Sequence, residues 1–195
     1  ASNIIHRDAP LKEKIANTIW RLKLQQEKLE HVASKLQRHD RELFEKCVAA
    51  ELSKDSPRAT VYANECVEVR KMAKMILLSQ LALEQVTLRL DTIQQFGDVL
   101  SEMAPLSSVV HTLKGRLSGI MPEVSFELGT ISEMLNGIVL EAGGTSGAFQ
   151  PIDTVSGESK KILDEAGSVA EQRLKEKFPE IPAITSHLGN EKTYY

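Results

Sequence analysis

The sequence predicts an all-α protein: a long antiparallel helical hairpin, shorter helices that pack back on it, and a flexible C-terminal tail. Residues 11–96 contain no glycine, and their only proline, Pro57, lies in the one obvious break. On each side of this break an apolar residue recurs every seven positions, as expected for helices packed along a continuous seam. The predicted seam residues are Ile15, Leu22, Leu29, Leu36 and Leu43 on the first helix and Tyr62, Val69, Ile76, Leu83 and Leu90 on the second.

The break between the two long helices carries the signal of a turn followed by a helix start. Ser56 is the predicted N-cap, because its hydroxyl can accept a hydrogen bond from a backbone amide of the first turn. Pro57 suits the first helical position, because its φ angle is already fixed and it has no N–H to satisfy. Asp8 and Pro10 repeat this signal, so we expect the first helix to begin near Pro10.

Residues that face each other across the seam are expected to have numbers that add up to 112, as Leu36 and Ile76 do. One such register satisfies the whole seam. Cys47 and Cys66 nearly fit the same rule and should therefore lie close together. We interpret them as packed free thiols, because two cysteines cannot form a disulfide framework. A disulfide is the alternative if the host is a hyperthermophile, where intracellular disulfides do occur.

The second half of the chain is built differently, since all 11 glycines lie at or after Gly97. Gly97 and Pro105 are predicted to end or kink the second long helix and to act as a hinge. Shorter helices are expected from about Leu106 to Gly119, from Pro122 onward, and from about Glu158 to Lys177. The predicted segments are an N-terminal extension (1–9), the basic hairpin (10–104), acidic glycine-interrupted helices (105–142), a linker (143–157) and a tail (158–195).

Charge is segregated along the chain, although the net charge is only −3. Residues 1–38 carry a net +4 and residues 91–142 a net −5. Four cations lie along the first helix at intervals of seven residues, and we call them the basic stripe: Lys14, Arg21, Lys28 and Lys35. These charges are either coiled-coil flank charges answered by the second helix, or they bind an anionic membrane or the acidic second half of the protein. The residues predicted to contact a membrane or polymer are Arg7, Lys12, Lys23, Arg38 and the stripe residues Lys14, Arg21, Lys28 and Lys35.

The sequence carries no signature of catalysis, cofactor binding or metal binding. The five histidines are scattered, and there is no Cys-x-x-Cys, no His-Glu-x-x-His and no glycine-rich phosphate loop after a strand. A pI of about 6.0 without basic–aromatic interleaving disfavours nucleic-acid binding. With no apolar run near 18 residues and no signal peptide, the expected compartment is the cytoplasm. We therefore expect a protein that is not an enzyme and has no cofactor.

Two stretches of the second helix are distinctive: Tyr62-Ala63-Asn64-Glu65-Cys66-Val67-Glu68-Val69-Arg70-Lys71 and Ser79-Gln80-Leu81-Ala82-Leu83-Glu84-Gln85-Val86. Together with the basic long hairpin and the acidic second half, they resemble the ESCRT-III (Snf7) family. Within that family the chain is similar to the archaeal CdvB-type cell-division paralogues, over about residues 5–142. The resemblance implies a subunit that polymerises with itself and its paralogues on membranes at the division site and drives constriction and scission. It also implies recycling by a CdvC-type AAA ATPase.

The C-terminal segment Phe178-Pro179-Glu180-Ile181-Pro182-Ala183-Ile184 resembles the proline-type MIT-interacting motif of the same family. The resemblance implies that its apolar residues anchor in a groove of the ATPase's MIT domain, while the prolines lower the entropy of ordering. Arg173 and Leu174 resemble the family's helical motif, but Ala170 and Lys177 stand where leucines are expected. The residues implied in MIT binding are Arg173, Leu174, Phe178, Pro179, Ile181, Pro182 and Ile184.

Two alternatives remain at this point. The proline-containing segment, taken without the family context, could be an ordinary surface linker. The whole chain could also be a non-catalytic coiled-coil adaptor or scaffold with a peptide tail, rather than a filament subunit. If the family reading holds, packing of residues 106–142 on the hairpin would keep the subunit closed, and straightening around Gly97 and Pro105 would open it.

Overall fold

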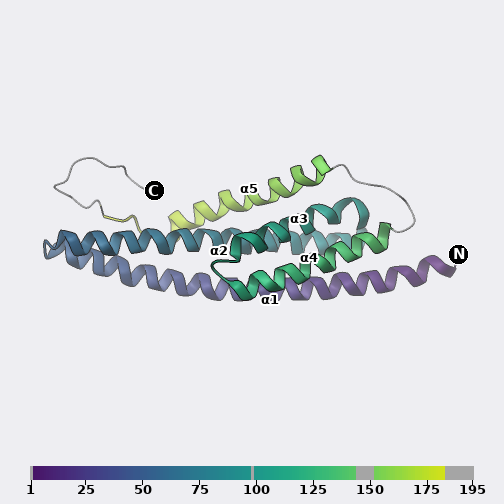
Figure 1. The fold of residues 1–195 in the computed structure, drawn as a ribbon, viewed down its shortest axis with the longest axis horizontal. Helices are drawn as coiled ribbons and strands as arrows, with labels where there is room; N and C mark the ends of the chain where they lie inside the picture. Colours follow the sequence, from purple (N-terminus) through teal and green to yellow (C-terminus); the bar gives the residue numbers. More distant parts are fainter. Residues whose placement is uncertain (1, 98, 144–151, 183–195) are drawn as a thin grey trace.

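The computed structural model describes residues 2–97, 99–143 and 152–182, and these ranges contain five helices and no strand (Figure 1). The all-α fold predicted from the sequence is confirmed. The helices are α1 (Ser2–Leu52), α2 (Ser56–Phe96), α3 (Val99–Leu117), α4 (Pro122–Gly143) and α5 (Ile152–Lys177). The predicted start of the first helix near Pro10 is wrong, because α1 begins at Ser2 and Pro10 lies inside it. With 51 residues, α1 extends for roughly 77 Å, and α2 runs back along it.

The α1–α2 hairpin is closed by the predicted apolar seam. Eight of the ten seam residues are buried, whereas Leu36 and Tyr62 are half-buried. Two polar contacts between the helices report the register: Gln26 Nε2 donates to Thr87 Oγ1 at 2.8 Å, and Arg70 Nε donates to Asp40 Oδ1 at 2.8 Å. The residue numbers of these pairs add up to 113 and 110, close to the expected 112.

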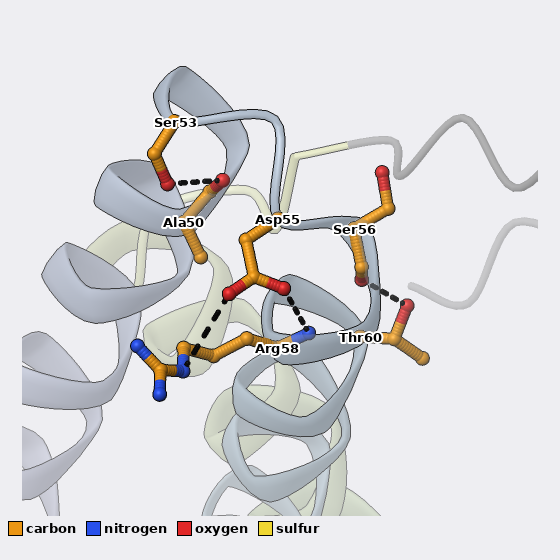
Figure 2. Close-up of polar contacts among 6 residues, drawn as sticks. All are labelled: Ala50, Ser53, Asp55, Ser56, Arg58 and Thr60. Carbon is orange, nitrogen blue, oxygen red and sulfur yellow. Dashed lines mark hydrogen bonds and ion pairs between the residues drawn. The ribbon is translucent and has the colours of Figure 1, made fainter.

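The turn between α1 and α2 is capped by Asp55, so the predicted N-cap at Ser56 is wrong by one residue (Figure 2). Asp55 Oδ1 accepts a hydrogen bond from the backbone N–H of Arg58 at 3.3 Å, and the carboxylate also pairs with the Arg58 side chain. An ionised carboxylate is a stronger acceptor than a hydroxyl, and it complements the positive end of the helix dipole. Pro57 is accordingly the second residue of α2, one position beyond the first helical position predicted for it.

Lys54, two residues after the end of α1, adopts the left-handed conformation, with a φ of 60°. The N–H groups of Lys54 and Asp55 bond to the carbonyls of Glu51 and Ala50 at 3.0 and 2.9 Å, the pattern of a Schellman cap.

Because glycine carries no Cβ penalty in the left-handed conformation, Lys54→Gly is expected to stabilise the protein by about 1 kcal/mol. Urea unfolding tests this, with Lys54→Ala as the control; equal midpoints for the two variants would contradict the prediction.

The shorter helices cover the half of the hairpin that lies near the N-terminus of α1 (Figure 1). α3 and α4 pack against each other; α3 also contacts α2, and α4 contacts α1. Their apolar faces join the hairpin in one continuous core cluster. The apolar residues predicted for the helix that begins at Pro122 are all buried, namely Val124, Leu128, Ile131, Leu135 and Ile138. In the described ranges, no helix is both long enough and apolar enough to cross a membrane.

The chain reverses at Gly97, and the predicted break at Pro105 is wrong. Gly97 ends α2, and a Cβ at this position would come within 2.7 Å of the Ile93 Cα atom. Pro105, in contrast, lies inside α3 and is buried. A proline removes one helical hydrogen bond, but α3 is held by the packing of its apolar face against α2, α4 and α5. Of the two predicted hinge positions, only Gly97 lies between helices.

The C-terminal helix is part of the packed body, although residues 143–157 were predicted to be a linker that separates a flexible tail from the other helices. α5 begins at Ile152, inside that predicted linker, and it contacts α2 and α3. Its buried face belongs to the same core cluster as the hairpin and consists of Ile162, Leu163, Ala166 and Ala170. The small residues Ala166 and Ala170, four positions apart, allow α5 to approach α2 closely. The short distance between the helices is also seen at Gly167, where an added Cβ would lie 3.5 Å from Leu78 Cδ1.

Candidate functional site

The segment that follows α5 lies on the hairpin, beyond the part covered by the other helices (Figure 1). The N–H of Phe178 donates to the Leu174 carbonyl at 3.0 Å, and the chain then continues along α2 toward the hairpin turn. Phe178 is only 7% exposed. Ile181 is half-buried and packs against two small apolar clusters near the turn, which include Cys47 and Val69. Two of the apolar anchors predicted for a partner protein, Phe178 and Ile181, are thus occupied by the protein's own hairpin.

A buried ion pair lies beneath Phe178. Arg70 of α2 donates from Nε and Nη2 to the two carboxylate oxygens of Asp40 of α1, at 2.8 and 3.1 Å. The side chain of Asp40 is 1% exposed and that of Arg70 is 15% exposed. The Arg70 Cζ atom lies 5.5 Å from the centroid of the Phe178 ring, within the range of a cation–π interaction. One guanidinium therefore joins both hairpin helices and the tail.

An open groove of about 480 Å³ flanks this docked segment. Its apolar part is formed by Val67, Leu174, Phe178 and Ile181, and lysines of α2 and α5 lie at its edge. Among the other residues implied in MIT binding, Arg173 and Pro179 are exposed and Pro182 is half-buried. Ile184 lies outside the described residues. The tail is thus held by two side chains, while the residues between them face solvent.

Cys47 and Cys66 are both free and buried in the hairpin close to the site. The Cys66 thiol lies near the Asp40 carbonyl, at 3.9 Å. Burial raises the pKa of Cys66 to about 11, with a further contribution from the Asp40 carboxylate. Burial and the Glu51 carboxylate also raise the pKa of Cys47. Both thiols are therefore protonated at neutral pH, which is typical of packing and not of nucleophilic chemistry.

The basic stripe is only partly covered, and its acidic partners come from α4 rather than from α2. Lys14 pairs with Glu141, and Arg21 Nη1 lies 3.9 Å from Glu127 Oε2. Further along α1 the stripe continues with two exposed lysines, neither of which pairs with an acid in the described part of the chain. These exposed members are Lys28 and Lys35, and the other predicted cations Lys12, Lys23 and Arg38 are exposed as well. The side chain of Arg7 is not among those described.

Asp40 and Arg70 were not identified as site residues from the sequence, although a signal existed. The predicted register places residue 72 opposite Asp40, so an arginine two positions away is within reach of the carboxylate. In the described ranges, no group of three or more His, Cys, Asp or Glu side chains is arranged to hold a metal ion. The groove beside the tail is suited to binding a peptide, and the exposed cations of α1 are suited to binding an anionic surface.

Comparison with known proteins finds relatives in Sulfolobus acidocaldarius. Cell division protein B1 is 45% identical over 174 residues, which cover 89% of this chain and 81% of that protein. Cell division protein B is 37% identical over 184 residues, covering 93% and 70%, and Cell division protein B3 is 25% identical over 167 residues, covering 86% and 96%. No family model and no solved structure matches the chain. Identities of 45% and 37% over most of its length show that the chain belongs to the cell division protein B family.

Proposed function

We propose that this protein is an ESCRT-III-like subunit that acts in archaeal cell division, without enzymatic activity of its own. It polymerises on an anionic membrane surface at the division site and drives constriction and scission. A CdvC-type AAA ATPase then recycles it by binding the tail through its MIT domain. The observation that carries the proposal is the 45% identity to a cell division protein along a chain whose long hairpin exposes basic residues.

The described conformation corresponds to the closed form of such a subunit. α3, α4 and α5 bury their apolar faces on the hairpin, and α4 supplies acidic partners to two members of the basic stripe, Lys14 and Arg21. Exposed ion pairs of this kind contribute roughly 0–1 kcal/mol, so apolar packing holds α4 in place. Opening would free both cations and the apolar faces for a membrane and for neighbouring subunits. The three named relatives also make paralogues natural candidates for co-assembly.

Electron microscopy of the full chain with anionic liposomes tests the proposal directly. Filaments or tubulated vesicles support a polymerising subunit. Soluble, inert particles that leave the liposomes unchanged would favour the coiled-coil adaptor instead.

Reversal of two exposed stripe residues, Lys28→Glu with Lys35→Glu, is expected to weaken binding to anionic vesicles about thirtyfold or more. Each basic residue near such a surface contributes about 1 kcal/mol, and 1.4 kcal/mol corresponds to a tenfold change in affinity. Helicity should stay unchanged, because both side chains point into solvent. Vesicle sedimentation at low salt measures the effect. Lys160→Glu with Lys161→Glu on α5 is the matched control, and an equal loss in both variants would refute a role specific to the stripe.

A further inference from the structure

We propose that Trp20 is an anchor that enters the interface of an anionic lipid bilayer, and that the outer side of α1, opposite its seam with α2, is the surface that lies on the bilayer. The inference rests on the proposed membrane binding and makes it specific, because it names an inserted residue and the side of the rod that faces the lipid. Trp20 is the only tryptophan of the chain, and it is 60% exposed.

Trp20 points away from the rest of the hairpin. It lies two residues before the buried seam residue Leu22, which is a rotation of about 200° around a helix with 3.6 residues per turn. Ala16 and Leu24, one turn before and one turn after it, are exposed and half-buried, so the three side chains form a short apolar strip on the outer side of α1. Tryptophan is on average highly buried in folded proteins, yet this one does not belong to the core cluster.

The charge around Trp20 complements an anionic surface. Residues 12–38 carry seven lysines and arginines against three glutamates, a net +4. Arg38 lies about five helical turns after Trp20 and therefore points in the same direction. Glu13 and Glu27 also lie on the outer side of α1, so attraction by charge alone is modest and the aromatic ring supplies a second contribution. The exposed cations along this part of α1 are Lys23, Lys28, Lys35 and Arg38.

The equivalent position on α2 shows why the contact belongs to α1. Leu88 lies two residues before the seam residue Leu90 and is also 60% exposed, so it points away from the seam on the other side of the hairpin. Three positions after it stands Asp91, whereas Lys23 stands three positions after Trp20. Leu88 also follows Glu84 by one turn. An anionic bilayer is therefore attracted to the outer side of α1 and repelled by that of α2.

The exposed apolar side chains of α4 are excluded by the same reasoning. Phe126 and Leu140 are 73% and 75% exposed, but α4 contains four glutamates and no lysine or arginine. In Figure 1, α1 forms the lower edge of the molecule and α5 the upper edge. Contact through the outer side of α1 thus leaves α5 on the far side of the rod. Tryptophan suits such a contact, because its ring is apolar while its N–H can bond at the level of the lipid headgroups.

Substitution of the anchor in the full chain gives the first test. Trp20→Ala is expected to weaken sedimentation with phosphatidylglycerol vesicles about tenfold, because it removes the apolar surface that the bilayer covers. Leu88→Ala is the matched control, since the two side chains are equally exposed, and it should change binding by less than about twofold. Both variants should melt with the unmodified chain, because neither side chain belongs to the core cluster.

The fluorescence of the single tryptophan gives a second readout, which a purely structural role would not change. On phosphatidylglycerol vesicles the emission of the unmodified chain should shift to shorter wavelength, and lipids brominated close to the headgroup should quench it. Phosphatidylcholine vesicles should cause neither effect. The double variant Trp20→Phe with Leu88→Trp moves the probe to α2, where phosphatidylglycerol vesicles should leave the emission unchanged.

The outcomes separate the anchor from the function on which it rests. A chain that sediments with the vesicles while its emission stays unchanged overturns the anchor and leaves membrane binding intact. A shift without quenching by brominated lipid shows that another subunit covers Trp20, and equal quenching at positions 20 and 88 shows that the lipid selects no side; either result overturns the inference. A chain that does not sediment refutes the proposed membrane binding and the anchor with it.

Discussion

Ile76→Asp is expected to destabilise the protein by several kcal/mol. Ile76 is fully buried on α2 and belongs to the core cluster shared by the hairpin and the shorter helices. An aspartate there would place a carboxyl group without a partner among apolar side chains, and it would also remove the packing of the isoleucine. Losses of about 4 kcal/mol are at the upper end for single substitutions and require such a mechanism.

Thermal unfolding followed by circular dichroism measures this effect. For a chain of this length, 1 kcal/mol corresponds to about 2–4 °C, so the midpoint should fall by roughly 10 °C. Leu88→Asp is the matched control, because Leu88 lies on the same helix but is 60% exposed. That variant should stay within about 0.5 kcal/mol of the unmodified protein. A melting point for Ile76→Asp close to that of the control would refute the packing of the seam.

The hairpin could be predicted because its signal is local and repeated. One apolar residue in every seven, without glycine or proline, specifies both the helices and the face on which they meet. A turn with strong capping residues between two stripes of equal length leaves only an antiparallel arrangement. The N-cap was predicted at Ser56 but is Asp55, because the side chains of both adjacent residues can accept a hydrogen bond from a backbone amide of the first turn.

The docking of the tail could not be predicted, because a stripe of apolar residues shows that a helix has a buried face but not what covers it. On α5 this face includes Ile162 and Ala170, which could equally well have served a partner protein. The position of Phe178 over Arg70 depends on how α5 lies across the hairpin, and no repeat in the sequence encodes that angle. Pro105 shows the converse case, in which tertiary packing overrides a local helix-breaking signal.

The charge pattern was predictable in part for a similar reason. Segregation of basic and acidic residues indicates that the two halves attract each other, and α4 does supply the partners of Lys14 and Arg21. Which cations of the basic stripe lack an acidic partner depends on where α4 lies along α1. That Lys28 and Lys35 are exposed and have no acidic partner in the described part of the chain is therefore a finding of the structure, and we propose that these two members of the stripe meet the membrane.

The double substitution Phe178→Ala with Ile181→Ala is expected to reduce binding of the tail to the MIT domain about a hundredfold or more. Full burial of such a side chain contributes roughly 1.5–3 kcal/mol, and every 1.4 kcal/mol changes the affinity tenfold. The measurement requires a peptide of residues 158–190, because in the full chain the same substitutions also remove the contacts with the hairpin. Loss of those contacts would partly offset the loss of affinity for the partner.

Calorimetry with the isolated MIT domain compares this peptide with the unmodified one and with the control Glu180→Ala. Glu180 lies between the two anchors and is exposed, so its removal should change the affinity by less than about threefold, as expected for surface positions outside the buried contact. Equal affinity of the unmodified and doubly substituted peptides would show that the proline-containing segment is only a linker. The helix around Arg173 and Leu174, of which Leu174 is half-buried and Arg173 exposed, would then be the remaining candidate for the contact with the ATPase.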